Sequence, residues 1–217
     1  MAVESPVKVV KSKAKSLPAD YIYRRGAEHT ALDFAKEVIS PPPGYFNLNL
    51  ADGSTRLDHF INMNPVSGPN TDIPHPVEKY PWPFEDGACL IVTIGATLAQ
   101  LANLDAFMNE CWRVLVNTGK LHIMAPYYSS QTYWRNWRNI MPVADETFHY
   151  YSAEWLAAQG IEKELSCDFD LKRRTFYYHD YWELRGDVAK EFARQHYFNV
   201  VSAMEIDLVA VKPIRRF

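Results

Sequence analysis

The chain has 217 residues, of which 47% are hydrophobic, 14% aromatic and 23% charged. This length and composition allow one well-buried core and exclude a largely disordered chain; the longest apolar runs are only strand-sized, which excludes a membrane-spanning helix. The net charge of −3 is uneven, because residues 1–25 carry +4 and the remainder carries −7.

The N-terminal region is basic and lacks the apolar core of a signal peptide. We therefore expect a cytoplasmic location, or one within an assembled particle. A basic arm on an acidic body suggests a partner for the arm, either a protein or larger assembly or a nucleic acid. A solvated tail without a partner is the alternative. We expect an extended arm at 1–19, a helix at 29–39, and a proline connector that ends at Gly44.

A single domain is expected to occupy 45–217, after the 20–44 segment of helix and connector. Strand-like runs occur at 45–50 and 59–63, and continuous apolar strands at 88–94 and 120–125. Only ten residues separate Leu50 from Ile61, too few for a full crossover helix, so the linking helix should be vestigial.

The longest expected helix, at 98–116, stops at Asn117–Thr118–Gly119 and connects two buried strands. This order predicts a right-handed parallel crossover. Further along the chain, the sequence predicts a short helix from Ser152 to Gly160, a strand at 161–169, a helix at 187–196, and a final strand or strand pair at 199–212.

The cysteines and histidines are not spaced as metal ligands. Cys89, Cys111 and Cys167 are widely separated and lie in apolar or strand-like stretches, which is typical of buried free thiols. His149 and His179 are similarly scattered, and no metal site is predicted.

Several motifs follow one another in a recognisable order: Leu48–Asn49–Leu50, Pro81–Trp82–Pro83–Phe84–Glu85–Asp86, Glu110–Cys111–Trp112–Arg113–Val114–Leu115, Gly119 and Pro126. This succession resembles a large group of bacterial and phage class I methyltransferases that use S-adenosylmethionine. The resemblance covers about Tyr45–Tyr128 well and the C-terminal third loosely. It implies an α/β fold with a Rossmann-type, mostly parallel sheet and helices on both faces. It also implies that Glu110 and Arg113 pair or cap at a helix end.

The resemblance places the cofactor beside Ala51, Asp52, Gly53 and Asn64, and here the sequence departs from the family. The family has Gly-x-Gly in place of Ala51–Asp52–Gly53, so Ala51 adds a Cβ where the backbone should approach the cofactor. The family also has an acid, which accepts hydrogen bonds from both ribose hydroxyls, where this chain has Asn64. The Glu-His pair often found near the reaction centre is replaced within Thr97–Leu101, and no catalytic residue is identified.

An aromatic segment follows the strand at 120–125, on the edge that faces the acceptor in active relatives. Aromatic rings interleaved with arginines can stack on a base, a sugar or a partner protein; the alternative is a lid packed on the sheet edge. The candidate contact residues are Tyr127, Tyr128, Tyr133, Trp134, Arg135 and Trp137.

Two classes of function remain. The first is a non-catalytic interaction or structural component of a larger assembly, for example a phage particle or a multi-subunit complex, that has a methyltransferase fold and binds no cofactor. The second is an active methyltransferase that uses S-adenosylmethionine and acts on an unidentified acceptor.

Overall fold

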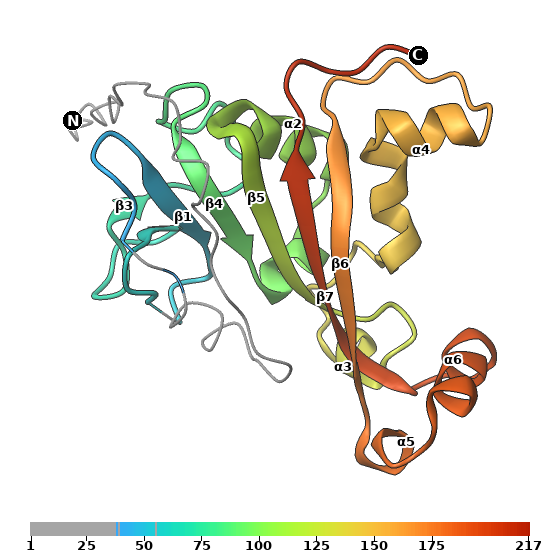
Figure 1. Cartoon of the computed structure of the whole chain (residues 1–217). Coiled ribbons are helices and arrows are strands. Elements are labelled where there is room, and N and C mark those ends of the chain that lie inside the picture. Colours follow the sequence, from blue (N-terminus) through green and yellow to red (C-terminus); the bar gives the residue numbers. More distant parts are fainter. Residues whose placement is uncertain (1–37, 39, 55) are drawn as a thin grey trace.

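The computed structural model describes residues 38, 40–54 and 56–217, which form a seven-stranded sheet with helices (Figure 1). The strands are β1 (Phe46–Leu50), β2 (Ile61–Asn64), β3 (Ile73–Pro74), β4 (Cys89–Ile94), β5 (Leu115–Pro126), β6 (Phe169–Tyr178) and β7 (Val201–Ala210). The α-helices are α2 (Leu104–Val114), α3 (Gln131–Arg135), α4 (Ala153–Ala158), α5 (Asp180–Glu183) and α6 (Asp187–His196). The 3₁₀ segments are η1 (Ala96–Gln100) and η2 (Asp145–Tyr151). The expected arm at 1–19 lies outside the described residues, as does the helix at 29–39 apart from Val38.

The strand order is β3-β2-β1-β4-β5-β7-β6. Strands β1 to β5 are parallel, whereas β7 runs antiparallel to both of its neighbours, β5 and β6. This is the 3-2-1-4-5-6 order of a doubly wound sheet with one antiparallel strand inserted before its last member. The mostly parallel Rossmann-type sheet, with its four central strands adjacent, is therefore confirmed.

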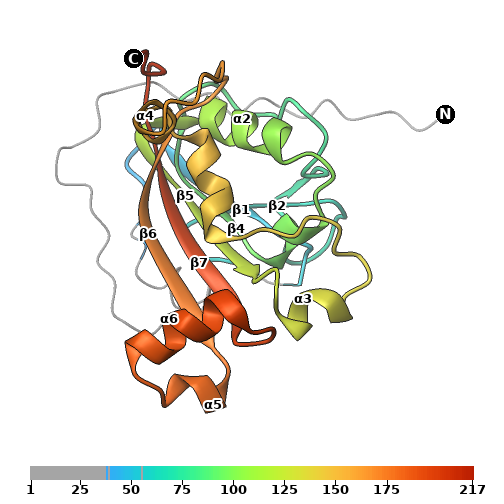
Figure 2. The same cartoon turned by 90° about the vertical axis from the view of Figure 1, so that its right-hand side faces the viewer.

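One face of the sheet carries the main core. On β1, Phe46, Leu48 and Leu50 all point into it, together with apolar side chains of β4, β5 and β7. Helix α2 covers this face with a buried stripe that includes Phe107 and Cys111, and α4 lies on the same side (Figure 2). The strands and α2 thus make one contiguous core.

The opposite face is polar along a row that crosses five strands. The register places these residues opposite one another in the order Asn62, Asn49, Thr93, His122 and Asp207. All five are buried, and the Asn49 amide donates to Asn62 Oδ1 at 2.9 Å. The described residues add only a small apolar cluster on this face, which includes Phe60 and Ile91. The two faces of the sheet therefore have different chemistry.

The motif residues near α2 form an ion network around the buried Glu110, so the predicted Glu110–Arg113 pairing is confirmed. The Arg113 guanidinium lies 2.6 Å from Glu110 Oε1 and 2.6 Å from Asp86, and it donates to the carbonyls of Phe84 and Trp82. Glu110 also accepts the Trp82 backbone N–H. The Arg113 side chain thus links the proline-rich loop at 82–86 to the C-terminal end of α2.

Two expected elements are corrected. The helix expected at 98–116 is divided, because Asn103 caps a new helix by accepting the Ala106 N–H. The apolar spacing continued across this break because Leu98 and Leu101 belong to the same core. The strand expected at 161–169 begins only at Phe169 and continues to Tyr178. The helix at 187–196 is confirmed, and the stretch 199–212 contains a single strand, β7 (Val201–Ala210), rather than a strand pair.

Helices α5 and α6 fill the connection between β6 and β7 and project beyond the end of the sheet (Figures 1 and 2). No helix in the described part of the chain is both long enough and apolar enough to cross a membrane.

Candidate functional site

The candidate site lies at the carboxyl ends of β1, β2 and β4. Strands β1 and β4 are neighbours at the point where the chain order reverses, which is where doubly wound sheets bind ligands. The predicted residues Ala51–Gly53 follow β1, and Asn64 ends β2. The structure brings them to the same edge: the Ala51 N–H donates to Met63 O at 3.4 Å, and Asn70 Nδ2 donates to Gly53 O at 3.0 Å.

The connection between β1 and β2 is a turn. No helix occurs among its described residues, 51–54 and 56–60, which agrees with the expected loss of a crossover helix. Asp52 Oδ1 accepts the Ser54 N–H at 2.9 Å, and Gly53 has φ +92°, a left-handed conformation that favours glycine. Hydrogen bonds from the Ser54 side chain and backbone lower the pKa of Asp52. Its carboxylate is therefore ionised and held within the turn.

Asn64, at the end of β2, is fully buried. Its Nδ2 donates to Asn70 O at 2.8 Å and to Thr71 Oγ1 at 3.0 Å, both in the connection between β2 and β3. Its Oδ1 is buried and has no hydrogen-bond partner among the described residues. The NH₂ group of Asn64 is thus already hydrogen-bonded to the connection between β2 and β3.

The segment after β4 supplies no acid or base, because none of residues 95–101 has an ionisable side chain. Leu98 and Ala99 are buried in η1. The Ala99 carbonyl accepts the backbone N–H groups of Ile140 and Met141 at 2.8 and 2.9 Å. The segment after α3, at Ile140 and Met141, is therefore hydrogen-bonded directly to η1.

The six aromatic-segment residues separate into two groups. Tyr127 and Tyr133 are buried, and Tyr127 Oη accepts a hydrogen bond from Arg194, so neither offers a contact surface. The exposed members are Tyr128, Trp134, Arg135 and Trp137. Trp137 is 84% exposed and lies under the Arg138 guanidinium. Only this second group can contact a substrate or partner.

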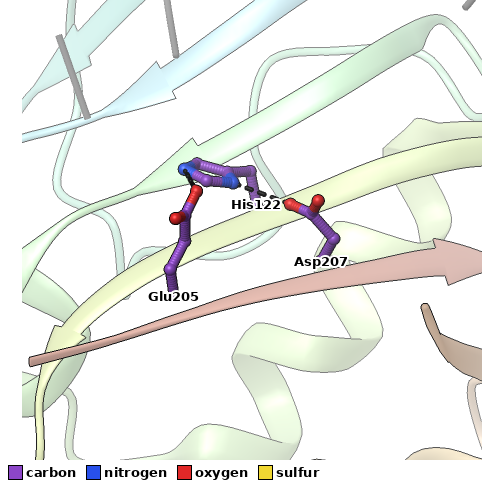
Figure 3. Close-up of side chains that lie close together, drawn as sticks. All are labelled: His122, Glu205 and Asp207. Carbon is purple, nitrogen blue, oxygen red and sulfur yellow. Dashed lines mark hydrogen bonds and ion pairs between the residues drawn. The ribbon is translucent and has the colours of Figure 1, made fainter. Parts of the chain in front are cut away.

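A buried charge cluster on the polar face was not anticipated. His122 of β5 lies between two carboxylates of β7, with Nδ1 2.8 Å from Asp207 and Nε2 3.4 Å from Glu205 (Figure 3). Tyr177 Oη donates to the second oxygen of Glu205, and Lys120 Nζ lies 3.5 Å from Asp207. The signal in the sequence was the alternation of polar and apolar residues within both strands.

This cluster could hold a proton, or it could ligate a metal ion. Its three ligand atoms lie within 4.8 Å of one another. His122, Glu205 and Asp207 all have further partners in the chain, and a basic Lys120 lies alongside. The arrangement is that of a packed ion network, in which buried charges satisfy one another.

Comparison with solved structures gives the class of this fold. A SAM-dependent methyltransferase from Archaeoglobus fulgidus matches with a TM-score of 0.50 at 11% identity, covering 76% of this chain and 86% of that one. The YcgJ protein of Bacillus subtilis gives 0.47 at 10% identity, covering 80% and 93%. A 16S rRNA (adenine(1408)-N(1))-methyltransferase from Catenulisporales acidiphilia gives 0.42 at 13% identity, covering 80% and 88%.

The chain therefore has the fold of class I S-adenosylmethionine-dependent methyltransferases. No protein-family profile matches the sequence. No curated protein matches it either.

Proposed function

We propose that this chain is a non-catalytic interaction or structural component built on the methyltransferase fold. The observation that carries the proposal is Asn64. At the position where the family resemblance expects a carboxylate for the ribose, this chain has an amide whose NH₂ group is already bound by Asn70 and Thr71. Its remaining oxygen is buried, so it could accept a ribose hydroxyl only after the loop opens.

The turn after β1 supports the same reading. Ala51 has a Cβ where the family backbone approaches the cofactor, and Asp52 adds an ionised carboxylate near the place of the cofactor's own carboxylate. Without a helix in the described connection, the site also lacks the helix N-terminus that favours anionic groups. The residues present therefore do not fit S-adenosylmethionine.

The chemistry gives a further reason. Methyl transfer depends mainly on holding the sulfonium in line with the acceptor atom, since the protein forms no covalent bond. A chain that does not bind the cofactor cannot hold its methyl group in line with an acceptor, and it therefore cannot catalyse the transfer. The segment after β4, which has no ionisable side chain, offers no acid or base to assist.

Isothermal titration of the full chain with S-adenosylmethionine tests the proposal. A typical micromolar site is worth about −8 kcal/mol, and losing several kcal/mol moves the dissociation constant toward millimolar. We expect no saturable binding tighter than roughly 50 µM. Saturable binding below that value overturns the proposal.

A double variant, Ala51→Gly with Asn64→Asp, sharpens the test. It restores the glycine and the acid that the resemblance expects. Recovery of measurable binding would identify these two positions as the source of the loss. Continued absence of binding, in a variant whose circular dichroism matches the parent, would mean that the crevice is remodelled more widely.

The second candidate is an active methyltransferase with a divergent site. It is favoured by open space beside the turn, since a Cβ added at Gly53 would meet nothing within 4 Å. Transfer of a labelled methyl group to an extract from the source cells, lost in an Ala51→Trp variant, would support this candidate. In that case S-adenosylmethionine is the cofactor and the acceptor lies near Tyr128, Trp134 and Trp137.

Contact surfaces complete the proposal. The basic arm at 1–19 is the first, with a protein assembly or a nucleic acid as its partner. The exposed aromatic group at Tyr128, Trp134, Arg135 and Trp137 is the second. Deleting the arm should abolish assembly with the arm's partner and leave the melting temperature of the monomer nearly unchanged. A large loss of monomer stability would instead place the arm in the core.

A further inference from the structure

The α5–α6 hairpin, defined as residues 179–199, carries an unusual concentration of exposed apolar side chains. Single exposed apolar residues are ordinary on protein surfaces, whereas a contiguous group marks an interaction site. The exposed fractions are 64% for Tyr181, 90% for Leu184, 88% for Val188, 53% for Phe192, 54% for Tyr197 and 60% for Phe198. The hairpin also projects away from the sheet, which leaves it accessible (Figures 1 and 2).

The hairpin is fixed to the body of the protein through α6. Arg194 lies 3.3 Å from the buried carboxylate of Asp145, donates to Tyr127 Oη at 3.0 Å, and lies 4.6 Å from the centre of the Phe176 ring. Its neighbour Ala193 is fully buried. A surface held this firmly loses little conformational freedom when a partner binds.

The hairpin has an apolar hollow between its helices and, outside that hollow, an exposed apolar side chain, Leu184. A hollow of about 600 Å³ lies between its helices and is lined mainly by apolar groups, among them Trp182, Val188, Phe192 and Tyr197. Leu184 lies outside this lining and is almost fully exposed. An isologous interface requires one patch to contain complementary features, because the same residues meet on both subunits. This hairpin meets that requirement.

The charges of the hairpin argue against a nucleic acid or an anionic membrane. It carries four acidic and three basic side chains, a net charge of −1 without its histidines. Two of the bases are paired within the hairpin, Lys190 with Glu183 at 3.4 Å and Arg194 with Glu191 at 2.7 Å. Phosphate-rich partners require an excess of positive charge. Exposed Tyr and Phe are instead typical of contacts between proteins.

We propose that the α5–α6 hairpin is a self-association surface whose occupant is the hairpin of a second copy of this chain. Six large side chains that are each more than half exposed offer an area comparable to one partner's share of a standard stable interface, which is about 800 Å². In the dimer, Leu184 of each copy fills the hollow of the other, and the rings of Phe192 and Tyr197 lose their exposure. The pairing is independent of whether the cofactor crevice binds its ligand.

Sedimentation velocity of the full chain between about 1 and 100 µM tests the pairing over the range of ordinary protein affinities. We expect a monomer–dimer equilibrium. A double variant, Leu184→Glu with Val188→Glu, should weaken it by more than about 100-fold, because four carboxylates would meet at the contact. Both positions are almost fully exposed, so the melting temperature should stay unchanged.

Two controls separate this surface from the others. Val66→Glu alters an exposed apolar side chain outside the hairpin, 70% exposed and located after β2, and should leave the dimer intact. Deletion of residues 1–19 should also leave the dimer intact. A chain that stays monomeric at 100 µM, or a dimer unaffected by Leu184→Glu with Val188→Glu, overturns the proposal. Titration with S-adenosylmethionine measures cofactor binding, whereas sedimentation measures dimerisation. The proposed function and the proposed self-association can therefore be contradicted independently.

Discussion

The two halves of the sheet differ in how much structure surrounds them. Around β4, β5, β7 and β6, the chain adds α2, η2, α4 and the α5–α6 hairpin. Around β1, β2 and β3, the described connections are turns, and β3 has only two residues. The half that would hold the cofactor is therefore the reduced one. Most of the buried residues of the main core belong to the elaborated half.

The largest effect should come from the ion network that anchors the elaborated half. Arg113→Ala leaves the buried Glu110 without its cation and should cost about 3–5 kcal/mol of unfolding free energy. Urea denaturation followed by circular dichroism measures it. Asp86→Ala is the control: this side chain is 79% exposed, and its loss should cost less than about 1 kcal/mol. Equal costs for the two variants would contradict a buried network.

A second test uses pH on the elaborated half. Burial alone would raise the pKa of Asp168, but hydrogen bonds from Arg215 and the Ala153 N–H outweigh it and hold the pKa below its usual value. The ionised carboxylate therefore stabilises the fold above the unfolded-state pKa near 4, and this contribution is lost as the pH falls through the lower folded value. Asp168→Asn should cost about 1.5–3 kcal/mol at pH 6.

The cost of Asp168→Asn should shrink as the pH falls through the folded pKa of Asp168, because the parent carboxyl then becomes neutral as well. Urea denaturation at pH 6 and at a series of lower pH values provides the comparison. A cost that does not change with pH would show that the charge of Asp168 is irrelevant and only its shape matters.

The third test concerns the reduced half. Asn64→Asp removes the NH₂ group that binds Asn70 O and Thr71 Oγ1, and places a carboxylate among acceptors. It should cost about 1–3 kcal/mol at pH 7, less in acid because protonation returns one donor. Asn64→Leu is the matched control, which loses the donors without adding charge and should show no such recovery in acid. An Asn64→Asp variant as stable as the parent would mean that the loop does not depend on this amide.

The smallest effect distinguishes two glycines in open surroundings. An added Cβ would meet nothing within 4 Å at Gly53 or at Gly186, but Gly53 has φ +92° and Gly186 has φ −67°. Gly53→Ala should cost about 1 kcal/mol or more through backbone strain, and Gly186→Ala should cost less, because Gly186 has an ordinary φ and loses only its N-cap preference. Thermal unfolding measures both. Equal effects would show that the turn after β1 readily takes another conformation.

The sequence predicted the parallel centre of the sheet well, because strands buried on both faces are continuous apolar runs such as 88–94. It placed β6 wrongly because an edge strand need not be apolar: Lys172, Arg173 and Arg174 lie within it. The short exposed stretch Glu162–Glu164 was included in the predicted strand because apolar residues flank it.

The positions of the candidate site followed from the order of strands and motifs, whereas its side-chain partners did not. That Asn64 would bind Asn70 and Thr71 depends on the path of a connection that has no regular structure. The cluster of His122 with Glu205 and Asp207 joins residues about 85 apart, which only the pairing of β5 with β7 brings together. Tyr127 and Tyr133 are aromatic like their exposed neighbours, so the sequence could not tell which of these rings are buried. Only the packing in the folded chain shows that Tyr127 and Tyr133 are buried.

The place of β7 in the sheet has a consequence for biosynthesis. Strand β7 lies between β5 and β6, yet it follows both in the sequence. During translation, β6 therefore has no neighbouring strand to pair with until residues 201–210 have left the ribosome. The parallel strands can form earlier, so the nascent chain passes through a state in which one edge of β5 is exposed and β6 is unpaired. We expect ribosome-bound chains that stop before β7 to depend on chaperones, and the β6–β7 half to become ordered last.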